Sequence, residues 1–402
     1  MGLVSYLKDK GIKRALEVLY QYKLDILFRR LILPLVKNKP LKDTIIIESH
    51  DDFDSNGGAL YDFLVREGYD RRYKIVWLLK HPRPKTLPRS VESYWLRKPS
   101  IKKMYRICTA KYLTADNELM EKARPEQVSL FCDHGGVSLK SVQGLYCLPD
   151  SVDYILSPSE NYAPVLAKQY DVAWPDKRFC HVGYPQHDVF WQASSNDLRK
   201  LTEKAYSKVF LWMPTFRKGI GFRRNDSATE QPFGIPLVQT REDLNRIQEF
   251  LEKTNSLLII KIHPKQDLST VTELQGSDNI RIVTGKDMKT LGINNYRLLK
   301  SVDGMISDYS SIAFSYMLLD RPVGFVLSDM DSYTRGFSVE DPEEYLAGHK
   351  IYDFQGFFAF LESVCRGDDP YAAARRELTD RLFVHKDGQS CRRITEILGL
   401  VK

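Results

Sequence analysis

From residue 42 onward the chain alternates short apolar runs with stretches of helical periodicity, and this alternation limits its fold more than any other feature. The runs are rich in Val, Ile and Leu, which is typical of strands buried on both faces of a parallel sheet. The helical stretches supply the crossover connections that parallel strands require. The sequence therefore predicts an α/β protein. The predicted strands are Thr44–Glu48, Lys74–Leu79, Tyr112–Ala115, Val128–Cys132, Tyr154–Ser157, Phe179–Gly183, Val209–Met213, Leu257–Ile262, Ile280–Val283, Gly304–Ser307 and Val323–Val326.

The pattern runs through the chain twice and predicts two Rossmann-like lobes, because 402 residues exceed the usual size of one domain. A polar segment of helical pattern, Trp191–Ser207, is the expected junction, which places the lobes at 43–207 and 208–402. Gly and Pro among charged residues predict a mobile loop at Lys218–Pro236. The predicted helices are Ala59–Glu67, Lys102–Thr109, Tyr162–Gln169, Arg241–Thr254, Ser311–Leu319, Phe357–Cys365 and Tyr371–Leu382.

Two lobes of this kind are typical of nucleotide-dependent transferases that bind their ligand in a cleft. No Gly-x-Gly-x-x-Gly sequence follows the first predicted strand, and the chain has no Walker A sequence. Both absences argue against dehydrogenases and P-loop enzymes.

Two of the predicted strands end in polar residues, and open α/β sheets bind their ligands at that edge. The strand 257–262 is followed by His263 and Lys265, and the strand 304–307 is followed by Ser310 and Ser311 at the start of a helix. Backbone N–H groups and serine hydroxyls at a helix N-terminus form an anion site. With a lysine and a titratable histidine on the neighbouring segment, this pattern predicts a site for a phosphorylated ligand such as a diphosphate.

The first 42 residues hold the entire net charge of the chain. They contain ten Lys or Arg and three Asp or Glu, a charge of +7, and the whole chain also carries +7. Leucines recur among them at helical spacing, but the longest uncharged apolar run, Leu31–Val36, is far shorter than the ~20 residues of a membrane span. No signal-peptide cleavage pattern follows. We expect a basic amphipathic helix on an anionic membrane surface. The alternative is a helix packed on the protein body with a solvated basic face.

Composition limits the other partners. A hydrophobic content of 43% with 28% charged residues is typical of a globular protein. The six cysteines are scattered without a Cys-x-x-Cys pair, which argues against a zinc site or a disulfide framework and fits a reducing compartment. No RNA- or DNA-binding motif is present, and no basic stripe occurs beyond residues 1–42, so we expect no nucleic-acid partner.

Several motifs occur in a fixed order along the chain and together carry a resemblance. They are Asp133-His134-Gly135-Gly136, Gly183-Tyr184-Pro185-Gln186-His187-Asp188, Pro214-Thr215-Phe216-Arg217, His263-Pro264-Lys265 and Ser307-Asp308-Tyr309-Ser310-Ser311, followed by Asp329, Tyr333, Arg335-Gly336-Phe337 and Asp387-Gly388. In this order the set resembles the CDP-glycerol glycerophosphotransferase family, which includes primases and polymerases of wall teichoic acid and related capsule enzymes. The resemblance extends from about Thr44 to Ile397.

The resemblance implies a GT-B-like fold and an enzyme that transfers glycerol phosphate from CDP-glycerol to an acceptor hydroxyl, releasing CMP. Family acceptors are lipid-linked saccharides and growing polyol-phosphate chains, so the implied role is teichoic-acid or capsule synthesis by a peripheral protein at the cytoplasmic face of the bacterial membrane. By the same resemblance, 43–207 is the acceptor-side lobe and 208–402 the lobe that binds the CDP-activated donor. Neither a metal nor a cofactor is implied.

The resemblance assigns the donor diphosphate to the second lobe. His263 and Lys265 would stabilise the charge that shifts onto the leaving CMP. Arg217 offers a bidentate fork that suits phosphate. The alternatives are a strand-end histidine satisfied by backbone groups and an arginine on a surface loop.

Serines after the strand 304–307 are expected to contact the same diphosphate. Ser310 and Ser311 would donate hydroxyl and N–H groups, while Ser307 and Asp308 shape the turn. Ordinary N-capping is the alternative, because Ser and Asp are favoured caps.

His134 follows the strand Val128–Cys132 and resembles the family's general base on the acceptor. A histidine with a pKa near ~6.5 can accept a hydroxyl proton at neutral pH. The family's usual Trp-His-Gly-Thr-Pro-Leu-Lys is altered here, since Asp133 replaces Trp and Gly136 replaces Thr, with Val137-Ser138 where one Pro is expected. Asp133 either raises the pKa of the base or caps the loop.

Asp329, Tyr333 and Arg335 follow the strand Val323–Val326 and resemble the family segment near the polyol of the donor. The carboxylate would accept polyol hydroxyls, and the alternative is a charged loop without a ligand. Ser315 stands where family members often have Asp, which either alters the donor pocket or is a neutral change on a helix face.

The segment from Asp52 to Gly57 matches the first half of a calcium loop, but the twelfth position is Phe63 rather than Glu, so an EF-hand is excluded. We expect instead a strand-to-helix turn that lines the acceptor side.

Alternative functions remain open at this stage. A ribitol phosphotransferase would use CDP-ribitol, a GT-B glycosyltransferase would use a sugar nucleotide, and an inactive scaffold would only bind membranes. The sequence does not decide the acceptor, the oligomeric state, or whether one unit or many are added.

Overall fold

The computed structural model describes residues 12–118, 120–146, 148–193, 197–214, 233, 235–262, 277–334 and 336–402. Contacts divide this part of the chain into two units. Unit 1 takes the described residues of Met1–Gly136, Gln143–Trp191 and Phe383–Lys402, and unit 2 takes those of Val137–Val142 and Gln192–Leu382. The sequence predicts two continuous lobes, whereas the chain passes from one unit to the other four times.

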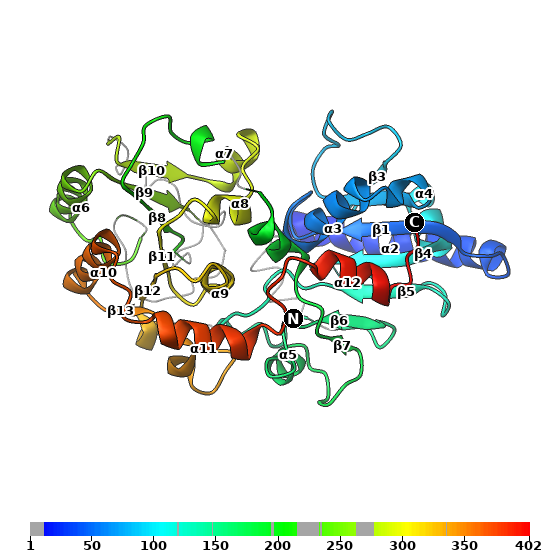
Figure 1. Ribbon diagram of the computed structural model, residues 1–402. Helices are drawn as coiled ribbons and strands as arrows, with labels where there is room; N and C mark the ends of the chain where they lie inside the picture. Colours follow the sequence, from blue (N-terminus) through cyan, green and yellow to red (C-terminus); the bar gives the residue numbers. More distant parts are fainter. Residues whose placement is uncertain are drawn as a thin grey trace. The chain divides into compact units, whose positions relative to one another are not determined.

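Unit 1 is built on a seven-stranded parallel sheet (Figure 1). The first strand of this sheet is β1. The next two strands, β2 and β3, are added on one side of it, and β4 is added on the other side, so the topological switch point lies between β1 and β4. In spatial order the strands are β3 (Glu92–Trp95), β2 (Lys74–Leu79), β1 (Lys42–Glu48), β4 (Ala110–Ala115), β5 (Val128–Phe131), β6 (Tyr154–Leu156) and β7 (Phe179–Cys180). The helices of unit 1 are α2 (Ile12–Val36), α3 (Ser55–Arg66), α4 (Ile101–Thr109), α5 (Ala163–Gln169) and α12 (Ser390–Ile397).

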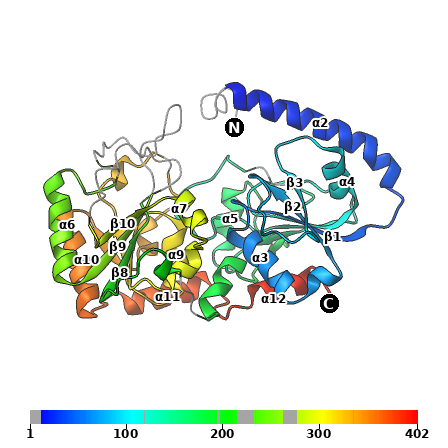
Figure 2. The ribbon, with the colours of Figure 1, turned by 90° about the horizontal axis from the view of Figure 1, so that it is seen from above.

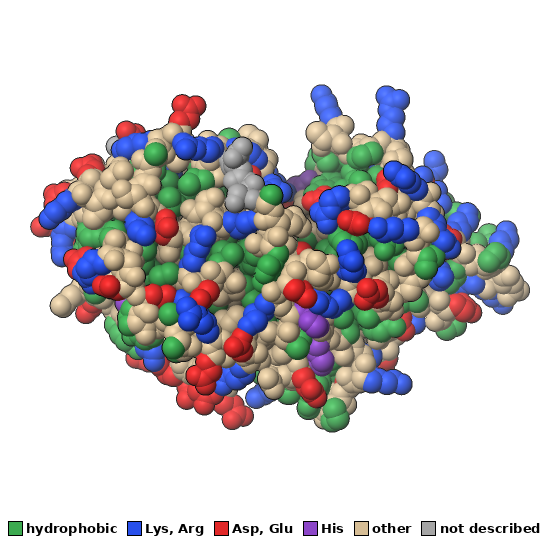
Figure 3. Space-filling model, in the orientation of Figure 1, with side chains coloured by type: hydrophobic (Ala, Val, Ile, Leu, Met, Phe, Trp, Pro, Cys, Tyr) green, Lys and Arg blue, Asp and Glu red, His purple; other side chains and the backbone are tan. Residues whose placement is uncertain are grey.

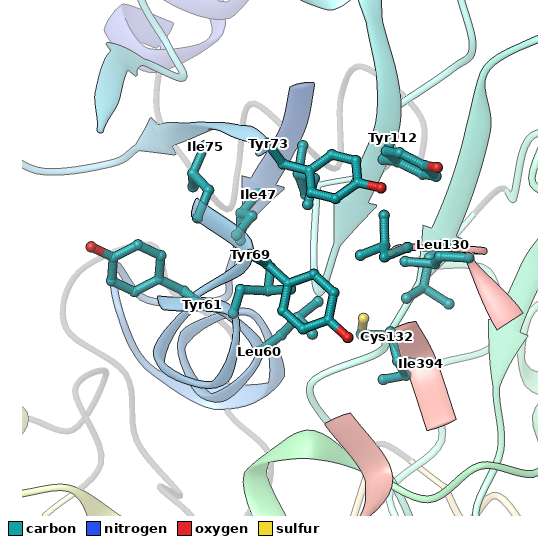
Figure 4. Packing of buried hydrophobic residues seen from close by; sticks show 14 of the residues in the cluster. Ile47, Leu60, Tyr61, Tyr69, Tyr73, Ile75, Tyr112, Leu130, Cys132 and Ile394 are labelled. Carbon is teal, nitrogen blue, oxygen red and sulfur yellow. The ribbon is translucent and has the colours of Figure 1, made fainter. Parts of the chain in front are cut away.

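Side chains of β1 alternate between the two faces of this sheet, as the two-residue period of a strand requires. Ile45 and Ile47 belong to the core that includes α3 and α12, while Ile46 belongs to a separate cluster. Figure 4 shows Leu60 of α3 and Ile394 of α12 in the core with Ile47. All five side chains are fully buried, and each burial contributes about 1.5–3 kcal/mol. This core fixes the edge at which the β1 and β4 loops emerge.

Helix α2 packs on unit 1 through one of its faces, next to α4 (Figure 2). Ile32 and Val36 contact the cluster that contains Met104 of α4. Lys103 of α4 is almost completely buried, and its Nζ donates to the Asp25 carboxylate at 2.8 Å. The packed-helix alternative is therefore correct for this face of α2.

Unit 2 is built on a six-stranded parallel sheet, and its switch point lies between β8 and β11. Helices α6 and α10 pack on its core, and α11 packs on α9 (Figure 1). In spatial order the strands are β10 (Ile280–Val283), β9 (Ser256–Lys261), β8 (Lys208–Trp212), β11 (Gly304–Ser307), β12 (Val323–Val326) and β13 (His349–Ile351). The helices are α6 (Arg241–Lys253), α7 (Gly285–Thr290), α8 (Asn295–Leu299), α9 (Ser311–Met317), α10 (Phe354–Arg366) and α11 (Ala372–Leu382).

Every predicted strand is present, and the α/β class with two parallel sheets is confirmed. The sequence misses β3, β13, α7, α8 and α12, because these elements are short and rich in polar residues. The helical pattern predicted in Trp191–Ser207 is wrong, since the described part of that segment forms no α-helix: Trp191 ends the 3₁₀ helix Pro185–Trp191, and a 3₁₀ turn follows at Leu198–Lys200. Nearly all of the predicted mobile loop Lys218–Pro236 lies outside the described residues.

Acidic and basic side chains are mixed over the face shown in Figure 3. This mixture agrees with the equal numbers of acids and bases beyond residue 42. Within the part of the chain that the structure describes, no helix is both long and apolar enough to cross a membrane.

Candidate active site

The carboxyl edge of the unit 1 sheet gathers polar side chains around the switch point. Glu48 ends β1 and His50 follows it, Lys80 follows β2, Asn117 follows β4, and His134 follows β5. Since neighbouring parallel strands end at the same edge, these residues lie together, as the sequence predicts for His134.

The ring of His134 is half-buried and stacks face to face on the ring of His50. The centroids are 4.0 Å apart and the planes differ by 8°. Nδ1 of His50 lies 3.5 Å from Oδ1 of Asn117. Packing around the ring, with the charges of His134 and Lys80, lowers the pKa of His50 from its ordinary value, although part of the side chain stays exposed to solvent. His50 is therefore poorly suited to take up a proton at neutral pH.

A buried ion pair between Lys80 and Glu48 connects the strand ends at this edge. Nζ of Lys80 lies 2.5 Å from Oε1 of Glu48 and also donates to the carbonyl oxygens of Ser49 at 2.6 Å and His50 at 3.0 Å. Burial raises the pKa of Glu48, and the adjacent Lys80 ammonium opposes that rise. The other oxygen of Glu48 accepts backbone N–H groups after β4, including that of Asn117 at 3.0 Å. The pair thus joins the ends of β1, β2 and β4.

Asp133 caps the loop that carries His134. Its carboxylate accepts the N–H of Gly135 at 3.0 Å and of Gly136 at 2.8 Å. Burial raises the pKa of Asp133, while these two N–H groups and the Tyr170 hydroxyl act in the opposite direction. The structure therefore supports the loop-capping alternative for this departure from the family pattern.

Asp116 is a second buried carboxylate at the same edge. One of its oxygens accepts the N–H of Gly57 at the start of α3, at 3.0 Å. Complete burial raises the pKa of Asp116 well above its ordinary value, and the nearby charge of Glu48 adds to that shift. This side chain braces the α3 turn against β4.

The rejected calcium segment forms the predicted strand-to-helix turn. Asp52 accepts the backbone N–H groups of Lys80 at 2.8 Å and His81 at 2.7 Å, and Asp54 caps α3 through the N–H of Ser55. Among the described residues, no group of three His, Cys, Asp or Glu side chains is placed to hold a metal ion.

The turn between β11 and α9 stands at the switch point of unit 2. Ser307 and Asp308 are buried, and the Ser307 hydroxyl lies 3.4 Å from the Met213 carbonyl oxygen. Ser310 and Ser311 are partly exposed, and Ser310 occupies the N-cap of α9 without a side-chain cap bond to the helix. The Ser310 hydroxyl therefore does not act as an N-cap of α9.

Asp329 and Tyr333 lie with Tyr309 in unit 2. The Tyr309 hydroxyl lies 3.5 Å from Oδ1 of Asp329, and the Tyr309 and Tyr333 rings are 4.5 Å apart. The ring of Phe337 completes this aromatic group, with its centroid 5.3 Å from that of Tyr309. Two of the three predicted polyol-binding residues are therefore adjacent. Ser315, the departure on α9, donates to the Ser311 carbonyl oxygen at 3.3 Å.

The segment 137–142 contacts the same aromatic group of unit 2. Lys140 forms a β-bridge with Phe337, and the Ser338 hydroxyl donates to the Ser138 carbonyl oxygen at 2.6 Å. Ser138 and Lys140 are thereby fixed beside Ser338 and Phe337. No pattern in the sequence indicates this pairing.

Four predicted site residues, Arg217, His263, Lys265 and Arg335, lie outside the described residues. The strands that precede the first three are β8 and β9, which are neighbours, and β8 also neighbours β11.

Two further motifs of the family pattern hold α12 on unit 1. The Asp188 carboxylate accepts the N–H groups of Ser390 at 2.9 Å and Cys391 at 2.8 Å. Gly388 has a φ of +68°, and a Cβ atom there would lie 2.8 Å from that of Trp191. These positions serve the fold, and they need no ligand to explain them.

The sequence alone does not single out His50, Lys80 or Asn117. Their only signal is that each follows a predicted strand directly or within two residues. His50 was further obscured because it adjoins the Asp-rich segment that resembles a calcium loop.

The fold and these two edges define a doubly wound α/β protein with a polar site at each switch point. The chain belongs to the family described as CDP-Glycerol:Poly(glycerophosphate) glycerophosphotransferase, which matches residues 31–399.

Known relatives act in teichoic acid synthesis. A teichoic acid glycerol-phosphate primase of Bacillus spizizenii is 34% identical over 188 residues, which are 46% of this chain and 43% of the relative. A teichoic acid ribitol-phosphate primase of the same organism is 24% identical over 254 residues, or 61% of this chain and 59% of the relative. The chain thus spans about half the length of these curated relatives. A structure of the wall teichoic acid polymerase TagF has the same fold, with a TM-score of 0.69, 18% identity, and coverage of 99% of this chain and 98% of that chain.

Proposed function

We propose that the protein transfers glycerol phosphate from CDP-glycerol to a hydroxyl of a lipid-linked saccharide or polyol-phosphate chain in teichoic-acid or capsule synthesis. His134 takes the proton of the acceptor hydroxyl. The acceptor oxygen attacks the phosphorus that bears glycerol, and the bond from that phosphorus to the CMP oxygen breaks. CMP leaves with the bonding electrons.

The observation that carries this proposal is the position of His134 at the carboxyl edge of unit 1, in a chain that belongs to the family. Its ring is half-buried, and its loop is held by Asp133. General-base catalysis by a positioned histidine contributes about 10²- to 10⁴-fold in rate.

Unit 2 is the proposed donor unit of a GT-B-like enzyme. Partly exposed Ser310 and Ser311 at the start of α9 are suited to the diphosphate, because hydroxyl and N–H donors there favour anions. Asp329 and Tyr333 provide a carboxylate and an aromatic wall for the glycerol moiety. We assign His263, Lys265 and Arg217 to the diphosphate, and Arg335 to the glycerol moiety.

Product analysis tests the proposed reaction. Purified protein is incubated with an acceptor and CDP-glycerol, CDP-ribitol or a sugar nucleotide, and the released nucleotide is separated by chromatography. We expect CMP from CDP-glycerol. Release of a nucleoside diphosphate from the sugar nucleotide alone would instead identify a glycosyltransferase, and no release from any donor would support an inactive scaffold.

CDP-ribitol is the second candidate donor, because one of the similar relatives is a ribitol-phosphate primase. The same incubation separates the two donors by their kcat/KM values, which we expect to favour CDP-glycerol.

We further propose that α2 binds the cytoplasmic face of the bacterial membrane. Helix α2 leaves large apolar side chains exposed at intervals of four residues, with one gap of seven, over much of its length. Bases dominate the same segment, and each contributes on the order of 1 kcal/mol near an anionic surface. The exposed apolar residues are Ile12, Leu16, Tyr20, Leu27, Leu31 and Leu35.

Flotation with lipid vesicles tests this surface. We expect the protein to float with vesicles that contain anionic lipid and much less with zwitterionic ones. Leu27→Ser/Leu31→Ser/Leu35→Ser should abolish flotation, while Leu145→Ser/Trp174→Ser/Trp191→Ser, which changes exposed apolar residues elsewhere in unit 1, should not. Equal flotation of both variants would exclude α2 as the membrane contact.

A further inference from the structure

His50 has a defined partner and a defined geometry, yet the reaction proposed above gives it no role. It follows β1 directly after Ser49, at the switch point of unit 1, and its ring covers one face of His134 at 4.0 Å with nearly parallel planes. A flat ring at that separation restricts rotation of the opposing ring about its Cβ–Cγ bond, because tilting either ring brings their atoms into collision.

His50 is itself fixed from three neighbouring strands. The ion pair of Glu48 and Lys80 is linked to its backbone, since Lys80 donates to the His50 carbonyl oxygen at 3.0 Å. Asn117, after β4, faces its Nδ1 at 3.5 Å. The residues that end or follow β1, β2 and β4 therefore hold a ring that in turn faces His134 in the loop after β5.

The charges around His50 disfavour its protonated form. The groups that face it are His134 from the β5 loop, Lys80 from β2, Asp51 on its own loop and the neutral Asn117 from β4. Packing around the ring, His134 and Lys80 disfavour a positive charge on His50, and Asp51 and Asn117 only partly offset them. Two imidazole rings at this distance are not readily in the positively charged form at the same time, because the like charges repel.

We propose that His50 is a positioning residue that aims the ring of His134 at the acceptor hydroxyl. This inference rests on the proposed function, in which His134 is the base.

Two substitutions separate stacking from proton transfer. His50→Phe keeps a flat ring and removes both nitrogens, while His50→Ala removes the ring. Loss of alignment of a catalytic group by about 1 Å lowers turnover by up to ~100-fold. We expect His50→Ala to reduce kcat roughly 10- to 100-fold with little change in the KM for CDP-glycerol, and His50→Phe to retain most of kcat. His81→Ala, at an exposed histidine of the same edge, is the matched control and should behave like the unchanged protein.

The pH dependence of kcat/KM distinguishes a positioning role of His50 from a merely structural one, which would leave the profile unchanged. Without the stacked ring, water reaches the freed face of His134 and favours its protonated form. The acid limb of kcat/KM should therefore move to higher pH in His50→Ala and stay in place in His50→Phe. Thermal unfolding of each variant verifies that it is folded.

An NMR titration of the His134 ring tests the inference without any turnover. The ring signals of His134 should keep their ring-current shift and titration midpoint in His50→Phe and lose both in His50→Ala. If the unchanged protein releases no CMP, the proposed function fails and this titration still decides whether His50 positions His134.

Three results would overturn the inference. Unchanged kcat and an unchanged His134 titration in His50→Ala would mean that the stack has no influence. Equal loss of kcat in the Phe and Ala variants would mean that the imidazole nitrogens matter. A loss in both as complete as that of His134→Ala would make His50 itself a proton acceptor.

Discussion

The carboxyl edges of the two sheets use similar residue types in opposite ways. In unit 1, Glu48, Asp116 and Asp133 are buried and accept backbone N–H groups, so the carboxylates brace the loops. In unit 2, the Ser310 hydroxyl at the start of α9 makes no cap bond to its helix. In our proposal, the first edge holds the ring of His134 in place and the second keeps its donors available for a ligand. A polar residue after a strand thus does not by itself indicate a catalytic or binding role, because its own hydrogen bonds can show that it is structural.

The largest effect that tests this comparison is on the free energy of unfolding, and it concerns the buried Glu48–Lys80 pair of unit 1. Lys80→Met leaves the buried Glu48 carboxylate without its partner, and removal of one member of a buried pair costs about 3–5 kcal/mol. Urea unfolding measures the change. Glu48→Gln in the same chain should restore much of the loss.

Lys122→Met provides the matched control for that prediction. Lys122 pairs with Asp153 at 2.8 Å in a more exposed setting, where a pair contributes about 0–1 kcal/mol. If both lysine variants lost the same stability, the unit 1 edge would not be a special brace.

A smaller effect is expected on donor binding in unit 2. The double variant Ser310→Ala/Ser311→Ala removes two hydroxyls and should raise the KM for CDP-glycerol about 30-fold, since two hydrogen bonds contribute on the order of 1 kcal/mol each. Its melting temperature should hardly change, because the Ser310 hydroxyl makes no cap bond to α9.

Ser100→Ala sharpens this prediction, because Ser100 accepts the Lys103 N–H as the N-cap of α4. That variant should lose about 1 kcal/mol of stability and keep its KM. The reverse pattern, with a cap-like loss of stability at Ser310 and Ser311 and no change in KM, would make these serines structural.

The smallest effect concerns the pH dependence of stability at Asp116. Its pKa is raised on folding, so between its ordinary pKa near 3.8 and its folded pKa the folded state binds more protons than the unfolded state. Stability from this group is therefore lost as the pH rises through that window. Asp116→Asn can still accept the Gly57 N–H, and its advantage over the unchanged protein should grow from pH 4 to pH 8. Urea unfolding at both pH values measures it, and an advantage that shrinks with rising pH would contradict the assigned shift.

The fold was largely predictable because buried runs such as Ile45–Ile47 carry a strong local signal. The sequence cannot show that Lys140 pairs with Phe337, since that contact joins residues nearly 200 positions apart. It also misses α12, whose start depends on the distant carboxylate of Asp188.

The candidate site was predictable only in part. His134 was identified because a motif marks it, whereas His50 depends on a ring contact that no spacing rule expresses. Asp133 illustrates the remaining ambiguity. The sequence allows it to tune the base or to cap the loop, and its hydrogen bonds to Gly135 and Gly136 support capping.

The most direct measurement is the rate of CMP release by His134→Ala, with donor affinity determined on the same sample. The account predicts a loss of about 100-fold or more in turnover with unchanged affinity for CDP-glycerol, because the proposed base and the proposed donor residues lie in different units. His385→Ala, another half-buried histidine of unit 1, should retain full turnover. Normal turnover in a folded His134→Ala protein would contradict the account.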